Sequence, residues 1–307
     1  MFLELGYLVD CVDNIVKYTG GINPKLGWPL FDPLDYSNFN FIRKDCCEFF
    51  KKKSDSYDIV LHLAAIVGGR LMIENNPLAV ASDLSIDSQF WQWAKENNPK
   101  KIICFSSSAA YPIKLQTEEN YKLLKEVDIN LENEIGMPDM SYGWSKLTHE
   151  YLGRLAYEKH GLNVVAYRPF SGYGIDQDDS YPFPSICKRV LINKGEENIF
   201  VWGTGKQMRD FIHIDDCVRG VMQTMDSINN GDAINLSTGI YTSFIQFAEM
   251  AAKGCGYSPL VSGLTSKPSG VFARGGDTCK QKDLGFNYEV DFQSGINEAL
   301  KFYDEII

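Results

Sequence analysis

Short apolar runs alternate with longer amphipathic segments along the first half of the chain. The runs read YLVDCV, FNFIR, DIVLHLAA, KIICFSS and NVVAYRP, and they begin at residues 7, 39, 58, 101 and 163. Helix-like patterns lie between some of them, at residues 77–97 and 142–160. A strand buried on both faces of a parallel sheet is short and continuously apolar, and a helix connects it to the next strand. The pattern predicts an α/β fold with a doubly wound parallel sheet over residues 1–170.

The pattern becomes irregular after residue 170. Three segments are rich in glycine, proline and polar residues, namely SGYGIDQDDSYPFP, VWGTGKQMRD and SGLTSKPSGVFARGG, which begin at residues 171, 201 and 262. Irregular segments of this kind carry binding residues more often than they form a core of their own. We expect residues 171–307 to form mainly a smaller domain that lines a site.

Composition and charge exclude several classes of protein. With 30 basic and 40 acidic residues the net charge is −10, which disfavours a nucleic-acid partner because such binding rests on neutralised phosphates. The eight cysteines are scattered without a CxxC pair or a His/Cys cluster, so the sequence predicts no metal site and a reducing compartment. The first residues do not resemble a signal peptide, and no apolar run approaches the roughly 20 residues of a membrane span. We expect a cytoplasmic protein without a membrane partner.

The strongest local motif is YGWSK, in which Tyr142 and Lys146 are four positions apart at the start of a predicted helix. This spacing places both side chains on one face, one turn apart. A lysine ammonium there stabilises the tyrosinate, so Tyr142 can act as a general base or acid. A packed tyrosine beside a solvated lysine would give the same spacing.

A serine cluster follows the apolar run that begins at Lys101. Ser107 and its neighbours lie where this strand ends, at the carboxyl edge of the predicted parallel sheet. Ligands of such sheets bind at that edge, and a hydroxyl there can bind a substrate oxygen while Tyr142 moves its proton. Serines in this position also serve as helix caps or turn formers.

Several motifs occur together in one order: LHLAA (61–65), SSSAAYP (106–112), SYGWSK (141–146), YRPFSGYG (167–174), WGTGKQMRDFIHIDD (202–216), INLSTG (234–239) and the R…D…LGF tail (274–286). In this order the chain resembles the extended short-chain dehydrogenase/reductase superfamily, in its NAD-dependent epimerase/dehydratase family. The resemblance runs from Gly6 almost to the C-terminus. It implies a Rossmann-like first domain, a C-terminal substrate domain over 171–307, and a return of residues 208–237 to the first sheet.

The resemblance also implies NAD as cofactor and a nucleotide-diphosphate sugar, linked to GDP or UDP, as substrate. The implied catalytic residues are Ser107, Tyr142 and Lys146. The implied cofactor-binding residues are Asp13, Asn14, Asp45, Cys46, Leu63, Ala64, Ala65, Tyr142, Lys146 and Arg168. The implied substrate-binding residues are Val67, Gly68, Ser108, Ser171, Arg209 and Arg274. A carboxylate at Asp13 would repel a 2′-phosphate, which favours NAD over NADP.

The loops around residues 67–70 and 106–112 resemble GDP-mannose 3,5-epimerase and GDP-fucose synthase. Members of that branch have an acid/base cysteine where this chain has Ala109, and their second acid/base aligns approximately with Tyr181. An alanine cannot move a proton. The remaining Ser-Tyr-Lys set favours a 4-epimerase that oxidises the sugar transiently. Alternatives are a dehydrogenase or keto-reductase, a 3,5-epimerase, or a non-catalytic protein that binds nucleotide sugars.

The start of the chain departs from the family pattern. Relatives open with a strand and a GxxGxxG turn that holds the cofactor pyrophosphate, whereas this sequence begins near the end of the helix that follows. We expect that the sequence starts at an internal methionine of a longer gene. The alternative is a protein without a phosphate loop, which would bind NAD poorly. We also expect a homodimer formed through residues 77–97 and 142–160, although Phe90, Trp91 and Trp93 could instead pack inside one chain.

Overall fold

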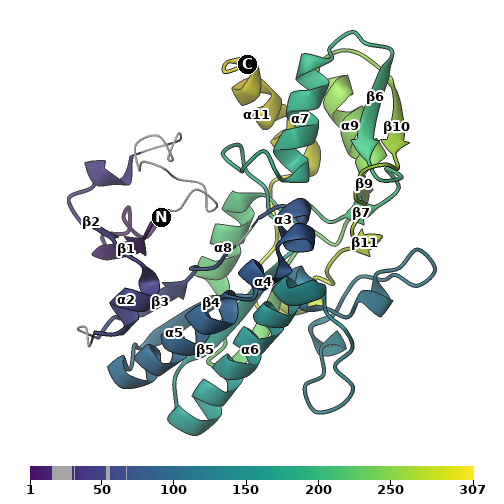
Figure 1. Cartoon of the computed structure of the whole chain (residues 1–307). Helices are drawn as coiled ribbons and strands as arrows, with labels where there is room; N and C mark the ends of the chain where they lie inside the picture. Colours follow the sequence, from purple (N-terminus) through teal and green to yellow (C-terminus); the bar gives the residue numbers. More distant parts are fainter. Residues whose placement is uncertain (16–29, 31, 53–55, 67) are drawn as a thin grey trace.

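The computed structural model describes residues 1–15, 30, 32–52, 56–66 and 68–307 (Figure 1). Its strands are β1 (Val9–Asp13), β2 (Phe39–Arg43), β3 (Ile59–His62), β4 (Lys101–Phe105), β5 (Val164–Pro169), β6 (Asn198–Trp202), β7 (Met208–Arg209), β8 (Asn230–Leu236), β9 (Thr242–Ser243), β10 (Leu260–Leu264) and β11 (Ala273–Arg274). Its α-helices are α2 (Cys46–Phe50), α3 (Arg70–Asn75), α4 (Pro77–Val80), α5 (Asp83–Asn97), α6 (Met140–His160), α7 (Pro182–Ile192), α8 (Ile214–Thr224), α9 (Phe244–Gly254), α10 (Cys279–Asp283) and α11 (Phe292–Asp304). Short 3-10 turns are η2 (Pro33–Asp35), η3 (Ser108–Ala110), η4 (Ile113–Leu115) and η5 (Glu126–Asp128).

A parallel sheet with strand order β3-β4-β5-β8 forms the centre of the first domain. Alternate residues of one strand face opposite sides, so Ile102 and Ile103 enter two different cores. Helices α5 and α6 cover one face and α8 covers the other (Figure 1). Burial on both faces explains why the strands are continuously apolar, and the predicted Rossmann-like α/β fold is confirmed.

The two long helical patterns appear with changed bounds. The pattern over residues 77–97 divides into α4 and α5, with a turn at residues 81–82. Helix α6 starts at Met140, two residues before the predicted start, and ends before Gly161, whose φ of +69° gives a left-handed C-cap. Phe90, Trp91 and Trp93 are buried inside the chain, so they are core residues and do not supply a dimer surface.

The strands β1 and β2 form a two-stranded sheet that is separate from the sheet containing β3. Strand β1 pairs in parallel with β2, whereas the described partner of β3 is β4. The β1-β2 pair is joined to the rest through α2, where the ring centroid of Phe50 lies 5.7 Å from that of Trp93.

The C-terminal region forms a second core. Strands β6 and β10 pair in parallel, and β7 lies between β11 and β9. Helices α7, α9 and α11 pack around a cluster that includes Phe183, Phe247 and Ile296. Strand β8 and helix α8 belong to the first sheet instead, since β8 pairs with β5.

Candidate active site

Tyr142 and Lys146 lie in the first two turns of α6, on the face predicted from their spacing. The Lys146 ammonium is 5.8 Å from the centroid of the Tyr142 ring. Its Nζ donates a hydrogen bond to the carbonyl of Phe105, 3.1 Å away, at the carboxyl end of β4. This bond ties the lysine to the strand that leads into the serine cluster.

Ser107 caps the short turn η3 that follows β4. Its Oγ accepts a hydrogen bond from the Ala109 N–H at 3.1 Å, so the serine does act as a cap, while its own O–H can still donate to a substrate oxygen. Helix α6 packs closely on this turn, because the Asp139 N–H donates to the Ala109 carbonyl at 3.0 Å. A Cβ atom at Gly143 would lie 2.4 Å from that carbonyl oxygen, so only glycine permits this approach. Ser107 and Tyr142 are therefore carried by two segments in direct contact.

The residues predicted for the adenosine end of the cofactor gather at the carboxyl ends of β1 and β2. Asp13 is exposed, and its Oδ1 accepts the Ile15 N–H at 2.6 Å. Asn14 donates to the carboxylate of Asp45 at 3.2 Å, and Asp45 caps α2. Cys46 follows as the first residue of α2.

Other predicted residues line the loops after β3 and β5. Leu63, Ala64 and Ala65 follow β3, with Leu63 exposed and both alanines half-buried. Val67 lies outside the described residues. Further predicted positions are Gly68 before α3, the buried Ser108 in η3, and Ser171 after β5 with a φ of +34°.

Arg168, a predicted cofactor-binding residue, is buried in the structure. Its guanidinium is 4% exposed and forms two hydrogen bonds to Glu150, of 2.8 and 2.6 Å. A third bond joins it to the hydroxyl of Tyr111 at 2.9 Å. A charge buried this deeply has to be paired, and Glu150 supplies the pair. The Arg168 side chain therefore fastens α6 to β5, and its contact with a cofactor stays a prediction.

Arg209 and Arg274, predicted to bind a diphosphate, lie side by side. They are paired residues of the parallel strands β7 and β11. Arg274 donates to the buried Asp139 at 2.9 Å, and Asp139 immediately precedes α6. The phosphate-binding candidates are thereby linked to the helix that carries Tyr142 and Lys146.

Asp83 lies beneath this site, at the first position of α5, and is 2% exposed. Its Oδ1 accepts the Ile66 N–H at 2.6 Å, while its Oδ2 has no hydrogen-bond partner among the described residues. Burial raises the pKa of Asp83 to about 6, although the Ile66 N–H and the Lys146 ammonium oppose the shift. The folded state therefore binds this proton more tightly than the unfolded chain does.

We expect Asp83→Asn to stabilise the protein increasingly as the pH rises. The raised pKa means that wild-type stability is lost as the pH climbs from about 4 towards 6, and the neutral amide avoids this loss. Relative to wild type, the free energy of unfolding of the variant should increase by about 1–2 kcal/mol between pH 5 and pH 8. Urea denaturation at both pH values measures it. The exposed Asp58→Asn serves as control, and a pH-independent difference at Asp83 would contradict the assignment.

A buried polar cluster that the sequence spacing did not predict consists of His62, Asp87 and His149. Their ligand atoms lie within 4.8 Å of one another, contributed by β3, α5 and α6. His62 Nε2 is 2.9 Å from Asp87 Oδ1, and His149 Nδ1 is 3.1 Å from the same oxygen. Burial lowers the pKa of His62 to about 4, so its imidazole is neutral near pH 7. These contacts join the two long helices to the sheet below Lys146.

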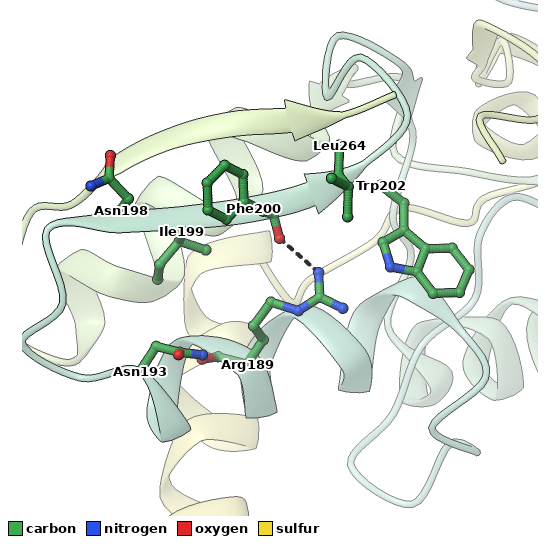
Figure 2. Close-up of a pocket in the computed structure, with 7 residues that line it drawn as sticks. All are labelled: Arg189, Asn193, Asn198, Ile199, Phe200, Trp202 and Leu264. Carbon is green, nitrogen blue, oxygen red and sulfur yellow. Dashed lines mark hydrogen bonds between the residues drawn. The ribbon is translucent and has the colours of Figure 1, made fainter. Parts of the chain in front are cut away.

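A separate pocket of about 320 Å³ opens between α7 and β6 (Figure 2). Arg189 of α7 donates to the carbonyl of Phe200 at 2.8 Å across it, and the indole of Trp202 lies at one end. None of the residues predicted to bind cofactor or substrate lines this pocket.

The described residues include no helix with the length and apolar character needed to cross a membrane.

The chain is similar to known proteins in sequence and in fold. GDP-L-colitose synthase of Yersinia pseudotuberculosis is 24% identical over 80% of this chain and 81% of its own length. GDP-L-fucose synthase 1 of Arabidopsis thaliana is 24% identical over 84% of this chain and 80% of its own length. UDP-glucuronic acid 4-epimerase of Bacillus cereus, crystallised with UDP-glucuronic acid and NAD, superposes with a TM-score of 0.80 at 24% identity, covering 99% of this chain and 93% of that one. The model of the NAD dependent epimerase/dehydratase family matches residues 28–237, which is more than half of the chain, and the protein belongs to this family.

Proposed function

We propose that the chain is an NAD-dependent nucleotide-sugar epimerase of the 4-epimerase type. The observation that carries this proposal is the meeting of two groups at one place. Ser107, Tyr142 and Lys146 stand at the carboxyl edge of the sheet, and Asp139 joins the start of their helix to Arg274, the strand neighbour of Arg209. The first group suits oxidation of an alcohol, and the second suits binding of a diphosphate.

The residues at the sheet edge fit a nicotinamide dinucleotide. The exposed Asp13 carboxylate ends β1, where it can accept hydrogen bonds from ribose hydroxyls. Ala64 and Ala65 follow β3 with small side chains that permit close approach. A nicotinamide dinucleotide held by these residues would supply reversible hydride chemistry at the sheet edge.

The side chains of this chain would handle the proton. Tyr142 takes the proton of the sugar hydroxyl, and the ammonium of Lys146 lies 5.8 Å from the centroid of its ring. The Ser107 O–H donates to the reacting oxygen and holds it beside Tyr142. One carbon would be inverted if the hydride returns to the opposite face of the keto carbon while Tyr142 returns its proton to the oxygen.

Ala109 disfavours epimerisation at C3 or C5. It is 1% exposed, and its carbonyl is occupied by the Asp139 N–H. A keto-sugar reductase acting on a GDP-sugar is the second candidate, because relatives named GDP-L-fucose synthase match most of the chain. Reduction would use the same three residues in one step.

A solvent-deuterium assay separates these reactions. The chain is incubated in D₂O with NAD and, in turn, with UDP-glucose, UDP-glucuronic acid and GDP-mannose, and the products are analysed by NMR. Inversion at C4 without solvent deuterium at any ring carbon is expected. Deuterium at C3 or C5 would reject the 4-epimerase proposal in favour of the other branch.

A reductase and a non-catalytic protein give different results. Net conversion of a keto sugar that consumes NADH identifies the reductase. Binding of UDP-sugar without turnover in any arm, in a preparation shown to hold NAD, identifies a binding protein.

We further propose that the protein is a cytoplasmic homodimer. Two exposed aromatic residues of α6, Trp144 and Tyr151, are available for the interface. Sedimentation of the Trp144→Glu variant tests whether the dimer depends on this face.

A further inference from the structure

A third arginine lies beside the two that were predicted to bind phosphate. Arg70 is the first residue of α3, far in sequence from Arg209 and Arg274. A Cβ atom at Gly270 would be 3.6 Å from Nη2 of Arg209 and also 3.6 Å from Nε of Arg70. The three guanidiniums therefore share one small region of the structure.

The acids in this region do not balance the arginines. Asp139 accepts hydrogen bonds from Arg70 at 3.0 and 2.9 Å and from Arg274 at 2.9 Å. Glu74 accepts one more from Arg70, at 2.6 Å. Three cationic groups thus share two carboxylates, which leaves one positive charge in a protein whose net charge is −10.

Arg209 carries most of this imbalance. It forms no ion pair with any described residue, and its Nη1 donates to the carbonyls of Met208 and Phe272. Burial and the neighbouring charges of Arg274 and Arg70 lower its pKa to about 9. Arg209 is half-buried, and a cation that is partly removed from water without a counter-charge is costly, so an anionic ligand would reduce that cost.

Arg70 also retains donors for a ligand. Its Nε and Nη1 are bound to Glu74 and Asp139, while the described contact of its Nη2 is the sulfur of Met140 at 4.0 Å. A guanidinium has five N–H groups in a rigid fork, so it can hold a carboxylate on one edge and a phosphate oxygen on another. Asp139 fixes this orientation directly in front of α6.

We propose that Arg70 is a further substrate-binding residue, which with Arg209 and Arg274 holds the diphosphate of a nucleotide sugar. This inference rests on the proposed function and adds to it a residue that was not among the predicted substrate-binding residues. It also assigns Asp139 the task of holding Arg70 and Arg274 at a set place relative to Tyr142.

Binding of UDP and GDP, measured by calorimetry on the complete chain, tests the inference. Arg70→Gln should raise the Kd of the tighter nucleotide about ten- to hundredfold, as expected for loss of charge-assisted hydrogen bonds. Arg70→Lys, which keeps the charge but not the fork, should lose less affinity. Glu74→Gln should bind the nucleotide at least as tightly as wild type, because it removes a carboxylate that competes for Arg70. A variant with a damaged fold would instead lose affinity.

Arg154→Gln, at an exposed pair on α6, is the matched control and should stay within twofold of wild type. Thermal unfolding confirms that each variant is folded. If Arg70→Gln binds like wild type while Arg209→Gln loses affinity, the role of Arg70 is wrong and the proposed function is unaffected. If the wild-type chain binds neither UDP nor GDP, the proposed function fails and this inference fails with it.

Discussion

Tyr142→Phe is expected to lower kcat by about 10²–10⁴-fold, the usual range for loss of a general acid/base. The phenol oxygen is the group that would exchange a proton with the sugar, and Phe keeps the ring beside Lys146. The hydroxyl of Tyr142 has no hydrogen bond within the described part of the chain, so its removal should leave the fold and the Kd for UDP or GDP unchanged. Initial rates and calorimetry, with the substrate identified in the deuterium assay, measure both quantities.

Tyr151→Phe is the matched control, since Tyr151 lies on the same helix and is 45% exposed. Its activity should equal that of wild type. A Tyr142→Phe enzyme that keeps more than a tenth of the wild-type kcat would show that another group moves the proton. Tyr181 is then the first residue to replace. Burial, and next to it the neighbouring Tyr142, raise the pKa of Tyr181.

Glu150→Ala is expected to lower the free energy of unfolding by about 3–5 kcal/mol, because it leaves the buried Arg168 without its counter-charge. Glu150 and Arg168 are 5% and 4% exposed and form a two-pronged pair. Arg168 also binds the hydroxyl of Tyr111, which closes the η3 turn. The loss should therefore reach the turn that holds Ser107, and urea denaturation followed by tryptophan fluorescence measures it.

The same helix provides the control, an exposed Glu158–Arg154 pair at 2.8 Å. Glu158→Ala should cost no more than about 1 kcal/mol, since water screens an exposed pair. Equal losses in the two variants would mean that Arg168 finds another partner or is solvated, and would contradict its structural role. A larger loss at Glu150 supports the structural role of Arg168.

The amino-acid sequence alone determined the features that depend on near neighbours. The apolar runs at residues 101–107 and 163–169 predicted buried parallel strands, and both appear, as β4 and β5. The spacing of Tyr142 and Lys146 placed them on one helical face because a helix repeats every 3.6 residues. The assignment of Arg209 and Arg274 came from family resemblance, and the structure places them side by side.

Tertiary structure decided what depends on packing between distant segments. Arg70 and Asp139 are 69 positions apart and meet because α3 and the start of α6 approach each other. Arg168 lies in a motif that suggests a cofactor contact. In the structure its guanidinium forms a buried ion pair with Glu150 of the facing helix α6. The sequence alone suggested interface residues at Phe90, Trp91 and Trp93. In the folded chain, α5 directs all three into the core. Periodicity fixes which residues share a face, whereas only the folded chain determines what that face contacts, because each contact depends on two segments at once.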